Sequence, residues 1–267
     1  ERARAELIEA VAEVEVEGEV ANLFLEEEEV DSATLDRSIR RLCHAGVAVP
    51  TLCGASLHGL GVEPLLDAMV AYLPSPAEAR VPEMLPSSPS SLAEVAEGSD
   101  GVSGSSNTAA TLEETADAVA LAFKVVHEPQ SRKPLVWLRV YHGELRSGDE
   151  VHTSAGGTER ITQLLRLHGE TTKLEESVAA GDIVASRGLR STQTGDTLLL
   201  RPRATLEKAK LAGVAIPPPV FFCSVETDSA AQHEALDAAL AAMRLEDPSV
   251  AVSVERTTGQ LLLGGMG

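Results

Sequence analysis

The residues best placed to do chemistry lie in one short loop, Gly54–Leu57, between an apolar segment at 47–53 and a helical pattern that begins near Val62. A loop at the carboxyl end of a buried strand is where open α/β sheets bind ligands. A turn at that point can direct its main-chain N–H groups at the carbonyl oxygen of a base such as guanine. A plain connection between a strand and a helix is the alternative, and these residues leave both interpretations open.

Ser56 in this loop also resembles the serine of a nucleophile elbow, which sits on a turn from strand to helix. That motif, G-x-S-x-G, requires glycine at position 58, where the chain has His58. The phosphate-binding loop G-x-x-x-x-G-K-[ST] is also missing, because the chain contains no Gly-Lys pair. The histidines lack the spacing of metal ligands. We therefore expect no catalytic residue and no metal ligand in this chain.

Three cationic side chains, Arg160, Arg166 and His168, are candidates for contact with phosphates, with an ordinary solvated surface as the alternative. The net charge of −19 argues against a nucleic-acid partner, because phosphate binding needs clustered Lys and Arg. However, residues 116–203 hold 11 acidic and 12 basic side chains. The excess acid therefore lies elsewhere, and this segment can present cations to RNA.

The elements that would position these residues begin with an α/β pattern over 1–76. Apolar spacing and capping residues predict a helix over 1–30, a second helix from the cap Asp31 to His44, a buried strand over 47–53 and an amphipathic helix over 62–73. Residues 77–115 are rich in Ser, Pro, Gly and acid, a composition that favours a disordered linker or insertion. Cys43, Cys53 and Cys223 are too few and too scattered for a disulfide framework, so we expect small core residues.

From residue 116 the apolar period changes to two, which is typical of half-buried strands. Several short strands punctuated by Gly-Asp turns predict a small closed β-barrel over 116–203. A connector with a short helical stretch follows at 204–217. Residues 218–267 then read as a strand, a helix and a hairpin, the first half of a ferredoxin-like unit.

The order of motifs resembles the elongation factor G family over nearly the whole chain outside the linker. The segments that carry the resemblance are Gly61-Val62-Glu63-Pro64-Leu65-Leu66-Asp67-Ala68, Leu121-Ala122-Phe123-Lys124, Arg139-Val140-Tyr141-His142-Gly143 and Glu246-Asp247-Pro248-Ser249. The resemblance implies a multidomain fold, α/β plus β-barrel plus α+β. Its parts would be the C-terminal end of a P-loop GTPase domain, a translation-factor β-barrel and a partial ferredoxin-like domain.

The resemblance also implies a GTPase that uses GTP and Mg²⁺, bound mainly by motifs upstream of this chain, so the chain alone is expected to be inactive. Ala55, Ser56 and Leu57 occupy the family's guanine-contacting loop, with Ala-Ser where the family has Ser-Ala. The barrel and the third domain would face the ribosome, namely small-subunit ribosomal RNA and a neighbouring ribosomal protein. Arg160, Arg166 and His168 are our choices for the RNA contact.

Within the family, the stretch Leu211–Cys223 is most similar to a mitochondrial branch that recycles ribosomes. That branch acts with a ribosome recycling factor to split subunits in the mitochondrial matrix, with a cytoplasmic or plastid location as the alternative. Translocation by an ordinary elongation factor G is the alternative function. A module that binds ribosomal RNA without GTPase activity is an alternative of another class. We expect no membrane and no DNA partner.

Overall fold

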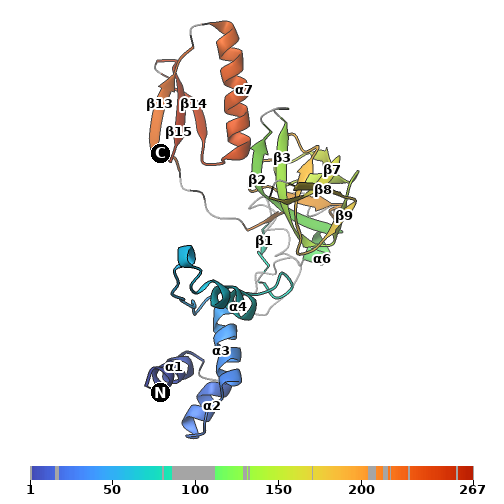
Figure 1. Cartoon of the computed structure of the whole chain (residues 1–267). Helices are drawn as coiled ribbons and strands as arrows, with labels where there is room; N and C mark the ends of the chain where they lie inside the picture. Colours follow the sequence, from blue (N-terminus) through green and yellow to red (C-terminus); the bar gives the residue numbers. More distant parts are fainter. Residues whose placement is uncertain are drawn as a thin grey trace, which may run out of the picture. The chain divides into compact units, whose positions relative to one another are not determined.

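The structure, a computed structural model, separates into two compact units, Glu1–Arg80 and Val81–Gly267 (Figure 1). It describes residues 2–15, 18–79, 81–85, 112–128, 131, 133–169, 171–203, 209–212, 216, 218–227, 229–256 and 258–266. Within these ranges no helix combines the length and the apolar character needed to cross a membrane. The predicted linker falls mostly on 86–111, outside the described residues.

The first unit begins with two helices, so the prediction of one helix over 1–30 is wrong. The helices are α1 (Arg2–Val14), α2 (Glu19–Leu25) and, after them, α3 (Ser32–His44). The chain breaks at Gly18, whose extended backbone (φ −85°, ψ 164°) forms the N-cap of α2. Glycine is a poor helix former, and the break lets Val11 and Val20 pack in one core with Leu35 and Leu42.

The cap of α3 is as predicted. Asp31 has extended backbone, and its carboxylate accepts a hydrogen bond from the Thr34 N–H at 2.9 Å. This satisfies one of the N–H groups that a helix start leaves without a partner. The hydrogen bonds with Thr34 also hold the pKa of Asp31 below its usual value.

The predicted buried strand at 47–53 is wrong. These residues form no strand, and Val49 is 84% exposed. A strand is stable only when its main-chain groups pair with a neighbour, and no described residue of the first unit offers such a strand. The next helix, α4 (Val62–Tyr72), forms as predicted, but its apolar residues are exposed, with Val70 at 81%.

The second unit contains a curled sheet of eight strands in the order β6-β5-β11-β2-β3-β10-β7-β8 (Figure 1). Their bounds are β2 (Ala118–His127), β3 (Pro134–His142), β5 (Glu150–Thr153), β6 (Thr158–Arg160), β7 (Gln163–His168), β8 (Thr171–Glu175), β10 (Ile183–Arg187) and β11 (Thr197–Leu200). A separate ladder joins β4 (Glu144–Arg146) to β9 (Ser177–Ala179). Inward side chains of alternate residues, among them Leu138, Leu164 and Leu198, form one buried core.

The sheet is barrel-like but not the fully closed barrel of the prediction. Its end strands β6 and β8 pair with β5 and β7 and not with each other in the described residues. Curvature comes from register shifts in β2, between Val119 and Ala120 and between Ala122 and Lys124. Such bulges bend a strand and increase its twist, so the sheet can wrap around the core.

Segments flanking the curled sheet are more ordered than the linker and connector predictions allowed. The short strand β1 (Met84–Leu85) pairs with β12 (Lys210–Leu211), and α6 (Leu112–Thr115) precedes β2. Met84 and Leu211 are buried in a second cluster against the outside of the sheet. The helical prediction for the connector is therefore wrong at 210–211, because β1 supplies a strand partner there, while 204–208 lie outside the described residues.

The last elements form the predicted half of a ferredoxin-like unit. They are β13 (Phe221–Val225), α7 (Ala230–Glu246), β14 (Ala251–Val254) and β15 (Leu261–Gly265), with sheet order β13-β15-β14. Ser229 caps α7 by accepting from the Gln232 N–H. Within α7, Leu240 is buried while Met243 is 42% exposed.

The cysteine prediction holds only in part. Cys43 is half-buried, whereas Cys53 and Cys223 are exposed, and all three are free thiols. Cys53 lies in the unpaired segment and Cys223 on the exposed strand β13, so neither has a core to enter.

Candidate functional site

The loop at 54–61 folds as a small closed ring. Ala55 and Leu60 exchange two main-chain hydrogen bonds, from Ala55 N–H to Leu60 C=O at 2.9 Å and from Leu60 N–H to Ala55 C=O at 3.2 Å. Between them lies a single 3₁₀ turn, η1 (Ser56–His58), in which the His58 N–H donates to the Ala55 C=O at 2.9 Å. The ring is held by main-chain bonds, so its shape depends little on which side chains it carries.

Glycines make this ring possible where its two ends cross. Gly61 has φ +77°, and a Cβ there would lie 2.8 Å from the Cys53 carbonyl oxygen and 2.9 Å from Gly54 Cα. A Cβ on Gly54 would in turn lie 3.0 Å from the Leu60 carbonyl oxygen. Only glycine permits both the left-handed backbone and this close approach.

Two of the three predicted residues have main-chain donors available to a ligand. Ser56 and Leu57 are the first residues of the 3₁₀ turn, and the first N–H groups of a helix have no acceptor within it. Ala55 differs, since its N–H and C=O close the ring. The Leu57 side chain is 92% exposed beside these donors. The loop can therefore offer two N–H groups and an apolar side chain to a planar ring that carries a carbonyl oxygen.

A whole nucleotide would also need a phosphate-binding loop and a metal site. The sequence lacks a phosphate-binding loop. In the part of the chain that the structure describes, no group of His, Cys, Asp or Glu side chains could hold a metal ion. The described residues thus offer main-chain donors in the loop at 54–61, and among them neither a phosphate-binding loop nor a metal-binding cluster occurs.

The three residues of the curled sheet predicted to contact RNA differ in exposure and in whether a carboxylate already binds them. Arg166 is bound by two carboxylates, Glu175 at 3.2 Å and Asp182 at 3.0 Å. The hydrogen bond from Arg166 holds the pKa of Asp182 below its usual value. His168 is exposed at the end of β7, where its C=O accepts from the Thr171 hydroxyl. Arg166 of β7 is therefore linked to the end of β8 and to the residue before β10, while His168 is exposed to solvent.

Arg160 is the most available of the three. It is exposed on β6, and its Nε donates to the Gly148 C=O at 3.1 Å. No carboxylate partner for it occurs among the described residues. It lines a shallow hollow together with His152 and Arg201. A main-chain carbonyl thus holds the guanidinium in place without neutralising its charge.

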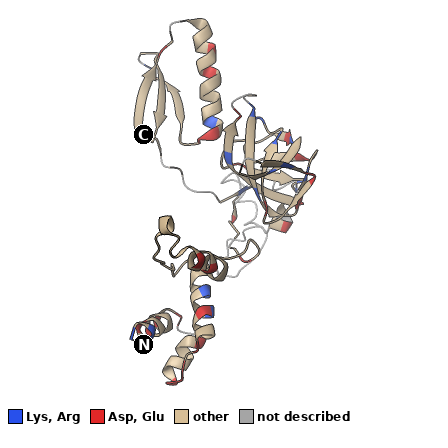
Figure 2. Ribbon diagram, in the orientation of Figure 1, with Lys and Arg blue, Asp and Glu red and all other residues tan. Residues whose placement is uncertain are grey.

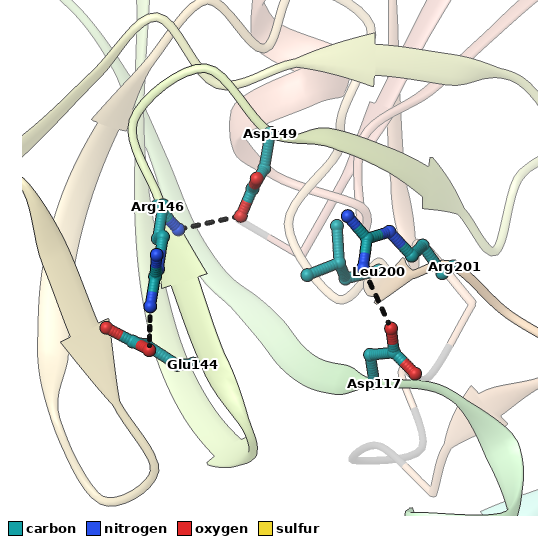
Figure 3. A pocket seen from close by; sticks show the side chains of 6 residues that line it. All are labelled: Asp117, Glu144, Arg146, Asp149, Leu200 and Arg201. Carbon is teal, nitrogen blue, oxygen red and sulfur yellow. Dashed lines mark hydrogen bonds and ion pairs between the residues drawn. The ribbon is translucent and has the colours of Figure 1, made fainter.

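An adjoining hollow shares Arg201 and brings in Arg146 (Figure 3). Arg146 pairs with Glu144 at 2.9 Å, and the Arg201 guanidinium reaches Asp117 at 3.4 Å. Asp149 accepts from the Arg146 N–H at 2.8 Å. Figure 2 shows the same mixture of both signs over the curled sheet as a whole. An incoming phosphate would have to replace carboxylates at these two arginines.

Sequence reasoning missed Arg146 and Arg201. Each lies at the end of a strand, Arg146 at the end of β4 and Arg201 directly after β11. A basic residue beside a turn is the only local signal. The place of Arg201 beside Arg160 in one hollow depends on the pairing of β5 with both β6 and β11, which the sequence does not reveal.

Comparison with known families matches two parts of the chain. The description "Elongation Factor G, domain III" matches residues 216–267, which hold the ferredoxin-like half. The description "Elongation factor Tu domain 2" matches residues 135–199, which lie in the curled sheet.

Known relatives match nearly the whole chain. "Ribosome-releasing factor 2, mitochondrial" is 36% identical in Danio rerio over 99% of this chain and 34% of that protein. The Rattus norvegicus protein of the same name is 37% identical over 99% of this chain and 33% of its own length. "Elongation factor G" of Orientia tsutsugamushi is 35% identical over 99% of this chain and 34% of that protein. The chain thus spans about a third of the length of the curated relatives it matches.

A solved structure supports the same fold. The crystal structure of a Thermus thermophilus protein is 25% identical and has a TM-score of 0.69. The match covers 100% of this chain and 34% of that one.

Proposed function

Because this chain belongs to the elongation factor G family of translation factors, we propose that the protein containing it acts on the ribosome as a GTPase. The observation that carries the proposal is similarity over 99% of the chain, which includes the closed ring, the curled sheet and the ferredoxin-like half. Translation factors of this family are multidomain proteins, and the chain spans about a third of its relatives. The phosphate-binding parts are therefore expected in residues beyond this chain.

The ring at 54–61 is proposed to contact the guanine base. The N–H groups of Ser56 and Leu57 would donate to the carbonyl oxygen of guanine, and the Leu57 side chain would lie against the base. This chain has Ala-Ser where the family has Ser-Ala. These contacts remain possible, because main-chain donors do not depend on side-chain identity. Bound GTP and Mg²⁺ would supply the phosphoryl chemistry through residues outside this chain. Ala55 has a supporting part, since it closes the ring.

Calorimetry on the 267-residue chain tests whether the phosphate contacts come from residues outside this chain. We expect no measurable binding of GTP with Mg²⁺, because two N–H groups and one apolar side chain cannot offset the entropic cost of association. Tight binding by this chain would refute the assignment of the phosphate contacts to other residues. The full-length protein should bind GTP, and replacing Leu57 by Asp should weaken that binding through repulsion of the guanine carbonyl oxygen and loss of the apolar contact.

We assign the protein to the mitochondrial recycling branch, in which it would split ribosomes after termination together with a ribosome recycling factor. Support comes from the ribosome-releasing names of the relatives from Danio rerio and Rattus norvegicus. The 35% identity with an elongation factor G keeps translocation as the alternative. The full-length protein should split post-termination ribosomes with recycling factor and fail to support polypeptide synthesis. Robust translocation, or a purely cytosolic location in cell fractions, would contradict the assignment.

Arg160, Arg166 and His168 are proposed to lie against small-subunit ribosomal RNA, with Arg160 making the main phosphate contact. Arg160 has an exposed guanidinium without a carboxylate partner in the described residues, whereas Arg166 is engaged by two. Binding of the full-length protein to small subunits is the assay, measured at several salt concentrations. Arg160→Ala should lower the slope of log K against log salt by about 1, as expected for one lost phosphate contact. An unchanged slope would exclude Arg160 from the interface.

A ribosomal RNA-binding module without nucleotide chemistry remains the rival. The coding sequence immediately upstream of residue 1 distinguishes the two. A G-x-x-x-x-G-K-[ST] segment in frame supports the GTPase, and an in-frame start codon adjacent to residue 1 supports the module.

A further inference from the structure

The last turn of α7 contacts the curled sheet within the second unit. Glu246 Oε1 accepts two hydrogen bonds from one residue of β2, from the His127 main-chain N–H at 2.7 Å and from His127 Nδ1 at 2.8 Å. The His127 side chain is 19% exposed and that of Glu246 39%, so the pair is only partly shielded from water. One carboxylate oxygen thus binds both the backbone and the ring of the same histidine.

A second contact lies one residue earlier in α7. The Thr194 N–H donates to the Leu245 C=O at 2.9 Å, and the Leu245 side chain packs against the core of the curled sheet. Thr194 is itself anchored, because its hydroxyl accepts from the Val125 N–H of β2 at 3.0 Å. The end of α7 therefore meets two segments of the sheet through consecutive residues.

The charged residues next to this pair in the chain have hydrogen-bond partners of their own. Glu128, next to His127 in the chain, is bound by Arg187 of β10 at 2.6 Å. Asp247, next to Glu246, accepts from the Ser249 N–H at 2.8 Å. The hydrogen bonds and charge of His127 outweigh the effect of burial and hold the pKa of Glu246 below its usual value. Glu246 is accordingly a charged acceptor at neutral pH, which strengthens both bonds.

We propose that His127 and Glu246 form a clasp that sets the orientation of the ferredoxin-like half on the curled sheet. The covalent connection alone does not set it, since residues 212–220 run between β12 and β13 without an assigned helix or strand among those described. The clasp constrains rotation because one of its bonds comes from the backbone of β2, whose position the sheet fixes. Opening the clasp would let the ferredoxin-like half reorient while both parts stay folded. The two residues are positioning residues and touch no substrate.

Backbone ¹⁵N relaxation and residual dipolar couplings of the 267-residue chain test the clasp. In the wild type, α7 and strands β2, β3 and β10 should share one rotational correlation time and one alignment tensor. Glu246→Ala should abolish this common tumbling, so that α7 acquires a shorter correlation time of its own. Glu246→Gln should restore much of it, since its amide oxygen can still accept both bonds. Glu234→Ala is the matched control, because Glu234 lies exposed on the same helix and has no hydrogen bond among the described contacts.

Separate tumbling of the two parts in the wild type would overturn the proposal, as would a Glu246→Ala chain that tumbles like the wild type. His127→Ala provides an independent variant, which should lose the ring contact and keep the main-chain bond. It should therefore loosen α7 less than Glu246→Ala does, and a larger effect would contradict the role given to the backbone donor. Trp137 fluorescence confirms in each variant that the curled sheet remains folded, because the chain has a single tryptophan and it lies in β3.

Discussion

Glu159 of β6 is the acidic side chain whose neutralisation should most weaken the curled sheet. Its carboxylate accepts from the N–H groups of Arg190, Ser191 and Thr192 at 2.7, 2.7 and 3.1 Å. The hydroxyls of Ser191 and Thr192 donate to it as well. Three successive main-chain N–H groups and two hydroxyls thus converge on one anion, which holds the loop after β10 against β6. Glu159→Gln removes the charge at almost constant shape.

The expected loss of stability follows from these bonds. A hydrogen bond to a charged acceptor contributes about 1.5–3 kcal/mol and one between neutral groups about 0.5–1.5 kcal/mol. The amide keeps one oxygen, so its NH₂ must face donors that lose their acceptor. Because the loop is at the surface and water replaces part of what is lost, we expect about 2–4 kcal/mol of destabilisation. For a domain of this size that is a fall in melting temperature of at least about 8 °C.

Urea unfolding followed by Trp137 fluorescence measures this loss, since the only tryptophan lies within the sheet. Glu150→Gln is the matched control, because Glu150 is exposed on the neighbouring strand β5 and has no side-chain hydrogen-bond partner in the described residues. The control should change the unfolding free energy by less than about 0.5 kcal/mol. Equal effects of the two substitutions would refute the reasoning.

The pH dependence gives a second check on Glu159. Burial alone would raise its pKa, but hydrogen bonds from Thr192, Ser191 and Arg190 outweigh burial and leave the pKa lowered. A carboxylate with a lowered folded-state pKa contributes stability above its unfolded pKa of about 4.3, and loses it as pH falls through the folded pKa. The difference between wild type and Glu159→Gln should therefore be complete at pH 7 and shrink below about pH 4. A difference that grows on acidification would contradict the assignment.

Two further substitutions test local features of the fold. Asp31→Ala removes the side-chain cap of α3 and should cost the first unit about 1 kcal/mol, measured by thermal unfolding in far-ultraviolet circular dichroism; an unchanged midpoint would contradict the cap. Gly143→Ala should destabilise the curled sheet far more than Gly156→Ala, as measured by Trp137 fluorescence in urea. Both glycines have positive φ, which costs alanine about 1–2 kcal/mol, but only at Gly143 would a Cβ collide with the Asp117 carbonyl oxygen. Equal losses would show that backbone strain, and not space, decides.

The sequence predicted the elements whose stability is local. The cap at Asp31 and the apolar spacing in α4 both depend on residues a few positions apart. Alternation of period two predicted strands for the same reason. The loop at 54–61 belongs to this class, because its main-chain hydrogen bonds close within 54–61 and its glycines are required by close contacts with residues 53–61.

Other features depended on partners distant in the chain, which no local pattern contains. The segment at 47–53 has the composition of a buried strand but remains unpaired, since a strand exists only beside another strand. Residues 210–211 became a strand because β1 pairs with them, despite a helical pattern. The break at Gly18 likewise depends on tertiary packing, because it lets residues of three helices share one core.

For the candidate site, residue types alone predicted a loop that could contact a base, showed that the sequence contains no phosphate-binding loop, and placed basic residues among the strands of residues 116–203. Only the tertiary structure decided which cations are available. Strand register places carboxylates on Arg166 and leaves Arg160 with a neutral main-chain partner. It also brought Glu246 to His127, 119 residues apart in the chain. Charge availability and long-range contact depend on which strands pair, and a linear sequence records composition and spacing but not that pairing.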